Sequence, residues 1–172
     1  QLFGVLDVTN GSVKNLLTLL DRANEHLDGK LNGSVEIGGT KDNPSVNVVG
    51  KISDVSIDDK VVGDATLNAS LANRKFKITT LKLPVDQGLI AMGGTVPLAA
   101  IYTSGYIPAN DSKSMDVTID FNEADMAVIP LVTTSVKNAT GPLKGVIRLT
   151  GTIDQPEAYG TVSVRNGTMK LA

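Results

Sequence analysis

The chain contains one hairpin motif twice. Residues 38–58 read GGTKDNPSVNVVGKISDVSID, and residues 151–171 read GTIDQPEAYGTVSVRNGTMKL. A Gly-Thr pair, an aspartate and a proline recur at a constant shift, since Gly39 corresponds to Gly151 and Pro44 to Pro156. Proline suits a strand end where no ladder donor is needed, and Asp-x-Pro favours a turn. We therefore predict a strand, a turn and a returning strand in both places, extending the same sheet.

Much of the chain outside these motifs alternates between apolar and polar residues. Met115, Val117, Ile119 and Phe121, for example, occupy every second position. This period gives each strand one apolar and one polar face, as in an antiparallel sheet. The sequence therefore predicts a mainly β protein: a long, curved antiparallel sheet that meanders over residues 30–172, with a loop at about 102–114.

One segment has helical periodicity, over about residues 12–28. Ser12 can cap its start and Gly29 can end it. Lys14 and Asn15 are expected to face solvent, together with Arg22 and Glu25. The apolar stripe of this amphipathic helix comprises Val13, Leu16, Leu17, Leu20 and Leu27, with Ala23 between. A second, shorter helix is predicted within residues 123–134 and should end before Pro130.

Composition excludes several classes of function. The 16 basic and 18 acidic residues give a formal net charge of −2, which does not favour binding to nucleic acid. The absence of cysteine rules out disulfides and thiolate metal sites. The single histidine, His26, has no nucleophile motif to partner it. We expect no catalytic residues, no metal and no cofactor.

The apolar face of the predicted sheet is the candidate functional surface. It is almost wholly aliphatic, because the chain has no Trp and only 3 Phe and 3 Tyr. Such strands fit either the core of a closed sandwich or the lining of an open trough. Few helical segments are available to cover so broad a sheet, and strand glycines allow it to bend. The candidate lining residues are Val35, Ile37, Val46, Val48, Leu67, Leu71, Phe76, Ile78, Val117, Ile119, Phe121, Val162 and Val164.

The order of these elements resembles the TamB family and, more distantly, the AsmA-like proteins of diderm bacterial envelopes. The resemblance rests on GSVKNLLTLLDRANEHLDGKLNGSVEIGGTKDNPSVNVVGKI at residues 11–52 and LKLPVDQGLIAMGGTVPL at residues 81–98. The second Gly-Thr-x-x-x-Pro motif, at residues 151–156, completes it. It covers nearly the whole chain, and the order of the motifs makes it more specific than any one of them.

The resemblance implies a β-taco fold, a long curved sheet with an apolar interior. It further implies a periplasmic region of an inner-membrane-anchored protein that takes part in phospholipid transport and outer-membrane biogenesis. An Omp85-type, TamA-like partner would be contacted through regions outside this chain. Because the chain begins at Gln1 and ends in mid-pattern at Ala172, we expect residues 1–172 to be one fragment of a larger β-rich repeat region.

Two functional hypotheses follow. In the first, acyl chains of phospholipid or another amphiphile lie along the apolar face, driven by burial at about 25 cal/mol per Å², and the helix stripe packs on the concave face as a lid. In the second, the sheet offers an open edge to outer-membrane polypeptides, which pair with it by strand addition. A closed structural sandwich, the third possibility, would bind no ligand.

Overall fold

The computed structural model describes residues 1–19, 27–40, 43–57, 60–97, 114–131, 136–152 and 154–171. The long strands are β1 (Gly4–Ser12), β2 (Leu27–Gly39), β3 (Pro44–Ile57), β4 (Lys60–Ala72), β5 (Lys75–Val85), β6 (Gly88–Pro97), β7 (Asp116–Asp125), β9 (Pro142–Gly151) and β10 (Pro156–Val164). The remaining elements are helix α1 (Val13–Leu19), the 3-10 helix η1 (Met126–Leu131) and the short strands β8 (Val136–Thr140) and β11 (Thr168–Leu171).

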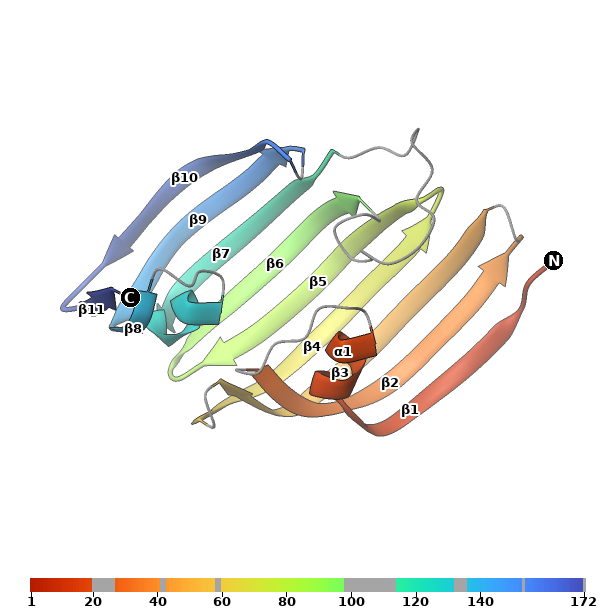
Figure 1. The fold of residues 1–172 in the computed structure, drawn as a ribbon, viewed down its shortest axis with the longest axis horizontal. Helices are drawn as coiled ribbons and strands as arrows, with labels where there is room; N and C mark the ends of the chain where they lie inside the picture. Colours follow the sequence, from red (N-terminus) through yellow and green to blue (C-terminus); the bar gives the residue numbers. More distant parts are fainter. Residues whose placement is uncertain are drawn as a thin grey trace.

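The nine long strands form one open sheet in the order β1-β2-β3-β4-β5-β6-β7-β9-β10 (Figure 1). Every neighbouring pair is antiparallel. Strands β8 and β11 pair only with each other, as a separate two-stranded ribbon. The prediction of a mainly β protein with a long antiparallel sheet is confirmed.

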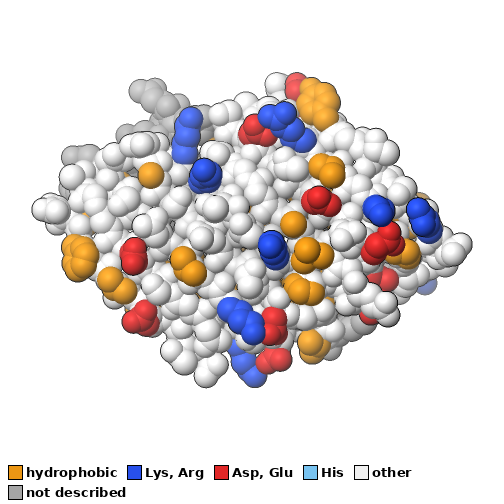
Figure 2. Space-filling view, turned by 180° about the vertical axis from the view of Figure 1, so that it is seen from behind, with side chains coloured by type: hydrophobic (Ala, Val, Ile, Leu, Met, Phe, Trp, Pro, Cys, Tyr) orange, Lys and Arg blue, Asp and Glu red, His pale blue; other side chains and the backbone are white. Residues whose placement is uncertain are grey.

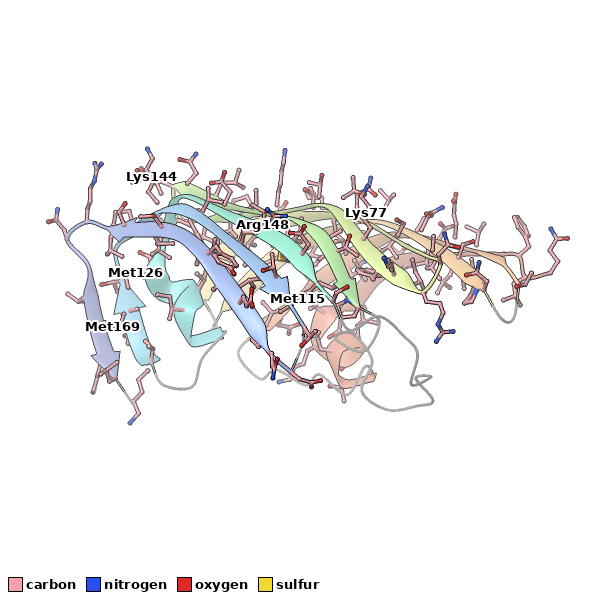
Figure 3. All side chains as sticks on the ribbon, turned by 90° about the horizontal axis from the view of Figure 1, so that it is seen from above. Lys77, Met115, Met126, Lys144, Arg148 and Met169 are labelled. Atoms are coloured by element: carbon pink, nitrogen blue, oxygen red, sulfur yellow. The ribbon has the colours of Figure 1, made fainter. Side chains whose placement is uncertain are left out.

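The sheet is arched, and the smaller elements lie on its concave side. Helices α1 and η1 and the β8–β11 ribbon stand on this side in Figures 1 and 3. Lys77 and Lys144 project from the convex side (Figure 3). Seen from behind, the convex side carries charged side chains and scattered hydrophobic ones among polar and backbone atoms (Figure 2). The two faces of the sheet therefore differ in chemistry as well as in shape.

The main core cluster lies where η1 and the ribbon meet the sheet. Met126 and Val128 of η1 are buried there. The carboxylate of Asp125 accepts hydrogen bonds from the backbone N–H of Ala127 at 2.7 Å and of Gly141 at 3.3 Å, and so fixes the start of η1. The cluster comprises Val85, Ala124, Met126, Val128, Val136, Ala139 and Leu143.

Helix α1 is shorter than predicted. Its start agrees with the sequence, because the Ser12 hydroxyl oxygen accepts a hydrogen bond from the N–H of Asn15 at 3.2 Å. Its expected extension to residues 27 and 28 is wrong, since Leu27 and Asp28 belong to β2 and pair with Ile57 and Ser56. Ladder pairing, together with contacts between Leu27 and the core cluster, outweighs the helical spacing. Residues 20–26 lie outside the described residues.

The second predicted helix exists as η1, but its expected end is wrong. It continues through Pro130 to Leu131. A 3-10 segment of this length makes few internal hydrogen bonds, so the missing N–H of Pro130 removes at most one. Of the loop predicted at about 102–114, only Ser114 lies within the described residues, and it forms an isolated bridge with Thr152.

The two hairpin motifs are structural copies. Gly39 pairs with Pro44, and Gly151 pairs with Pro156. The two glycines have φ values of 84° and 83°. In the first turn the N–H of Thr40 donates to the carbonyl of Asn43 at 3.1 Å, and in the second Thr152 donates to Gln155 at 3.1 Å. The repeated sequence therefore builds the same turn twice in one sheet, as predicted.

Candidate functional site: the apolar face of the sheet

Strand register places all thirteen candidate lining residues on one face. Residues directly opposite each other on neighbouring strands point to the same side. One continuous row of such partners crosses the whole sheet: Leu6, Val35, Val48, Ala69, Ile78, Gly94, Val117, Leu149 and Ala158. The other predicted lining residues lie on parallel rows of the same face, and Val164 lies at its end opposite Leu143.

The same face contains apolar residues that are not among the predicted lining residues. In β5 a register irregularity between Ile78 and Leu81 changes which alternate positions face the concave side. A strict period of two therefore fails beyond Ile78. The sign of this change in the sequence is the pair of adjacent threonines at 79 and 80, which interrupts the alternation. The additional residues are Leu6, Ile52, Leu81, Leu83, Ile90, Met92, Ile147 and Leu149.

Part of the apolar face is covered by the chain itself. Phe121 and Val162 pack against the core cluster beneath η1 and the ribbon, and Val117 is buried. Ile119 is half-buried, and Val164 is 44% exposed. The largest group of predicted lining residues outside that cluster lies on β2–β5. We call it the apolar strip: Val35, Ile37, Val46, Val48, Leu67, Leu71, Phe76 and Ile78, all half-buried except Ile37, which is 39% exposed.

The proposed lid residues are divided between elements. Val13 is buried at the start of α1. A Cβ added at Gly29 would lie 2.7 Å from Cγ2 of Ile52 and 3.6 Å from Cγ2 of Val13, so α1 starts close over β2 and β3. Leu16 is 41% exposed, Leu17 is half-buried and Leu27 lies in β2. Lys14 and Asn15 are exposed as predicted. Leu20, Arg22 and Glu25 fall outside the described residues.

The convex face carries ion pairs, along with exposed valines such as Val49 and Val146. The Arg148 guanidinium donates to both carboxylate oxygens of Asp116, at 2.8 and 2.7 Å, and these hydrogen bonds lower the pKa of Asp116. Lys51 lies 2.6 Å from Asp64 and likewise lowers the pKa of that carboxyl. These pairs are solvent-exposed, so they bring polarity to the face rather than much stability.

The described residues contain no arrangement typical of a catalytic or metal centre. No three acidic or histidine side chains among them could share a metal ion. A pocket of about 480 Å³ is lined by Asp86, Gln87, Glu123, Asp125 and Pro142. Two of its three acidic groups have partners, since Asp125 holds η1 and Glu123 lies 3.7 Å from Lys144. The apolar face of the sheet therefore remains the candidate functional site.

Neither of the described helices is long and apolar enough to cross a membrane. Comparison with models of protein families, with curated proteins and with solved structures finds no match to this chain.

Proposed function

We propose that the concave apolar face holds the acyl chains of phospholipid or another amphiphile, as a non-enzymatic segment of a lipid-transport protein. The observation that carries the proposal is the segregation of the two faces. Thirteen predicted lining residues share one side of a broad open sheet, while the charged side chains and ion pairs lie on the other, among scattered hydrophobic ones (Figure 2).

Energetics favour acyl chains as the occupant of the apolar strip. Each methylene removed from water contributes about 0.8 kcal/mol. The strip itself is made of Val, Ile, Leu and Phe side chains, which offer no hydrogen-bond donor or acceptor. A polar head group would lose hydration there without compensation, so it stays in water while the chains lie against the strands.

The resemblance to the TamB family supplies the biological setting of the proposal. In that setting the chain is a β-taco segment of an inner-membrane-anchored protein that acts in the periplasm during outer-membrane biogenesis. The Omp85-type, TamA-like partner belongs to the same proposal and would be met outside residues 1–172.

Adjacent valines on opposite faces provide a matched test. Val48 is half-buried on the apolar strip, whereas Val49 is 58% exposed on the convex side. A photoreactive diazirine amino acid is introduced at one position or the other, and each protein is incubated with vesicles of phosphatidylethanolamine and phosphatidylglycerol. After illumination, mass spectrometry should detect phospholipid adducts at position 48 and few or none at position 49.

Position 49 is the control for position 48, because both are valines of the same strand and they lie on opposite faces of the sheet. Equal adduct yields at the two positions would indicate non-specific contact with the bilayer. A complete lack of adducts at position 48, in a protein whose circular dichroism shows an intact sheet, would refute acyl-chain binding.

A further inference from the structure

The internal duplication extends beyond the two hairpins. The N–H of Leu2 donates to the carbonyl of Gly39 at 2.9 Å, and the N–H of Met115 donates to Gly151 at 3.0 Å. Strands β1 and β7 therefore approach the two turns in the same way. Each is antiparallel to the first strand of its hairpin, and each has an irregularity near the far end.

The irregularities are also equivalent. Asn10 and Glu123 both have positive φ values, of 54° and 56°. Each lies two positions after a residue that pairs with a glycine. Val8 pairs with Gly33, and Phe121 pairs with Gly145. A helix begins three residues later in both cases, with α1 and η1. The segments β1-α1-β2-β3 and β7-η1-β9-β10 are therefore two copies of one unit.

The two copies differ in their outer neighbour. In the first copy the outer edge of β3 is paired with β4 along most of its length. In the second copy β10 pairs with β9, and no other described strand pairs with it. The chain leaves β10 through a turn at Asn166-Gly167, and β11 then pairs with β8 on the concave side (Figure 1). Among the described strands, the edge that β4 occupies in one copy is therefore unpaired in the other.

The register shows which backbone groups this edge offers. Thr152 and Gln155 exchange two backbone hydrogen bonds, at 3.1 and 3.2 Å. Hydrogen-bonded and non-hydrogen-bonded pairs alternate along an antiparallel ladder. The β10 residues in non-hydrogen-bonded pairs with β9 are therefore Pro156, Ala158, Gly160, Val162 and Val164. Their backbone carbonyls, and all their N–H groups except that of proline, point away from β9.

After Pro156 and Glu157, strand β10 lacks the features that usually protect an edge, since Ala158 to Val164 include no charged residue and no proline. Its ladder with β9 runs without a bulge from Pro156 to Val164, and its sequence, PEAYGTVSV, contains no lysine. The other edge strand, β1, has a bulge after Val8 and an aspartate at position 7. Bulges and charged residues discourage strand pairing at edges. Of the two edges, β10 is the better acceptor.

We propose that the outer edge of β10 binds an extended polypeptide segment as an additional antiparallel strand, in the register that β4 adopts on β3. In that register Val46 faces Leu71 and Val48 faces Ala69. The equivalent positions on β10 are Ala158 and Gly160. The bound segment therefore carries apolar residues at alternate positions, directed to the concave side, and polar residues between them.

Disulfide trapping can test both the binding and its register, because the chain has no cysteine of its own. The probe is a synthetic peptide with the sequence of β4, KVVGDATLNASLA. Opposite residues in a hydrogen-bonded pair have Cα atoms about 5.5 Å apart, within the span of a disulfide. Protein carrying Ala158→Cys should crosslink rapidly with peptide carrying Leu71→Cys, and slowly with peptide carrying Ser70→Cys, which would face the other side.

A proline variant provides the affinity control. Ala158→Pro removes an outward N–H without removing a hydrogen bond to β9, whereas Ala158→Ser keeps that N–H. Fluorescence anisotropy with labelled peptide should show binding to the serine variant and roughly tenfold weaker binding to the proline variant. Equal affinities, equal crosslinking at positions 70 and 71, or disulfide-linked homodimers of Ala158→Cys protein in place of peptide adducts would each overturn the proposal. Acyl-chain binding at the apolar strip would be unaffected by all three results.

Discussion

Gly145 occupies a point where two strands approach too closely for a side chain. Its φ is 149°, and an added Cβ would collide with the carbonyl oxygen of Thr161 and lie 2.8 Å from Cα of Val162. Gly33 has the same role in the first hairpin, where an added Cβ would collide with the carbonyl of Val49. Non-hydrogen-bonded pairs bring antiparallel backbones together, and glycine is the residue that permits this contact.

We expect Gly145→Ala to destabilise the protein by at least about 2 kcal/mol, because the new methyl group must force β9 and β10 apart at a strained φ. Urea unfolding followed by circular dichroism would measure the loss. Gly4→Ala is the matched control, since an added Cβ at Gly4 has no atom within 4 Å. The explanation fails if both alanine variants unfold at the same urea concentration.

For single residues, the sequence predicted which face of the sheet a side chain occupies better than it predicted how deeply that side chain is buried. Period two assigned Val35, Val48 and Ile119 to the correct side, because alternation in a strand is set by backbone geometry. Burial depends on which distant element covers a residue. Phe121 and Ile78 share one apolar face, yet the core cluster packs against Phe121 and not Ile78. No local pattern carries that information.

Among the elements, α1 shows how a strand can take residues from a predicted helix. The apolar spacing of residues 13–27 fits a helical stripe, but Leu27 also fits the alternation of β2 and lies opposite Ile57. Helical hydrogen bonds form locally, whereas the ladder with β3 comes with burial against the core cluster. The sequence could indicate the start of α1 through its Ser12 cap, but it could not decide where the helix ends.

Within the described part of α1, the buried side chain is Val13, in the first turn. We expect Val13→Asp to cost about 3 kcal/mol, because it either buries an unpaired carboxylate or displaces the helix from β2 and β3. Val13 is 7% exposed. Thermal and urea unfolding of the variant would measure the effect, and uptake of a lipophilic dye would report whether displacement of α1 exposes apolar surface.

Leu16→Asp provides the comparison within the same helix. Leu16 is 41% exposed, so we expect this variant to lose less than about 1 kcal/mol. The lid hypothesis places both Leu16 and Val13 in the apolar stripe that packs on the sheet. A loss at Leu16 as large as that at Val13 would mean that the whole stripe is packed, and it would restore that hypothesis.

For the molecule as a whole, the antiparallel meander was predictable because consecutive strands pair with each other along most of the chain. The exception is the β8–β11 ribbon. The sequence interpretation placed residues 168–171 in the main meander, but they pair with β8 instead. Such a choice between two distant partners depends on which arrangement buries the core residues of η1 and β8, and it leaves no periodic signal in the sequence.

The duplication predicts unequal protection at equivalent positions. Val46 and Ala158 are counterparts in the two hairpins, but Val46 faces Leu71 of β4 whereas Ala158 is at the open edge. We expect the amide of Ala158 to exchange with deuterium roughly 100-fold faster than that of Val46, because only the latter must break a ladder bond to exchange.

Within β10, the amide of Thr161, which points toward β9, is the internal reference. Nuclear magnetic resonance would resolve all three amides. Equal protection of Ala158 and Thr161 would mean that another strand already covers the edge.

The number of strands has a consequence for how copies of this sheet can meet. Nine antiparallel strands are an odd number, so β1 and β10 run in the same direction. Copies related by simple translation would join β10 to β1 as a parallel pair, the less stable kind per residue. An antiparallel join about a twofold axis perpendicular to the sheet brings like edges together, β10 to β10 or β1 to β1. Open-ended growth by antiparallel joins would therefore need both kinds of edge, and the bulge in β1 discourages pairing at that edge. A join through β10 alone stops at a pair of copies.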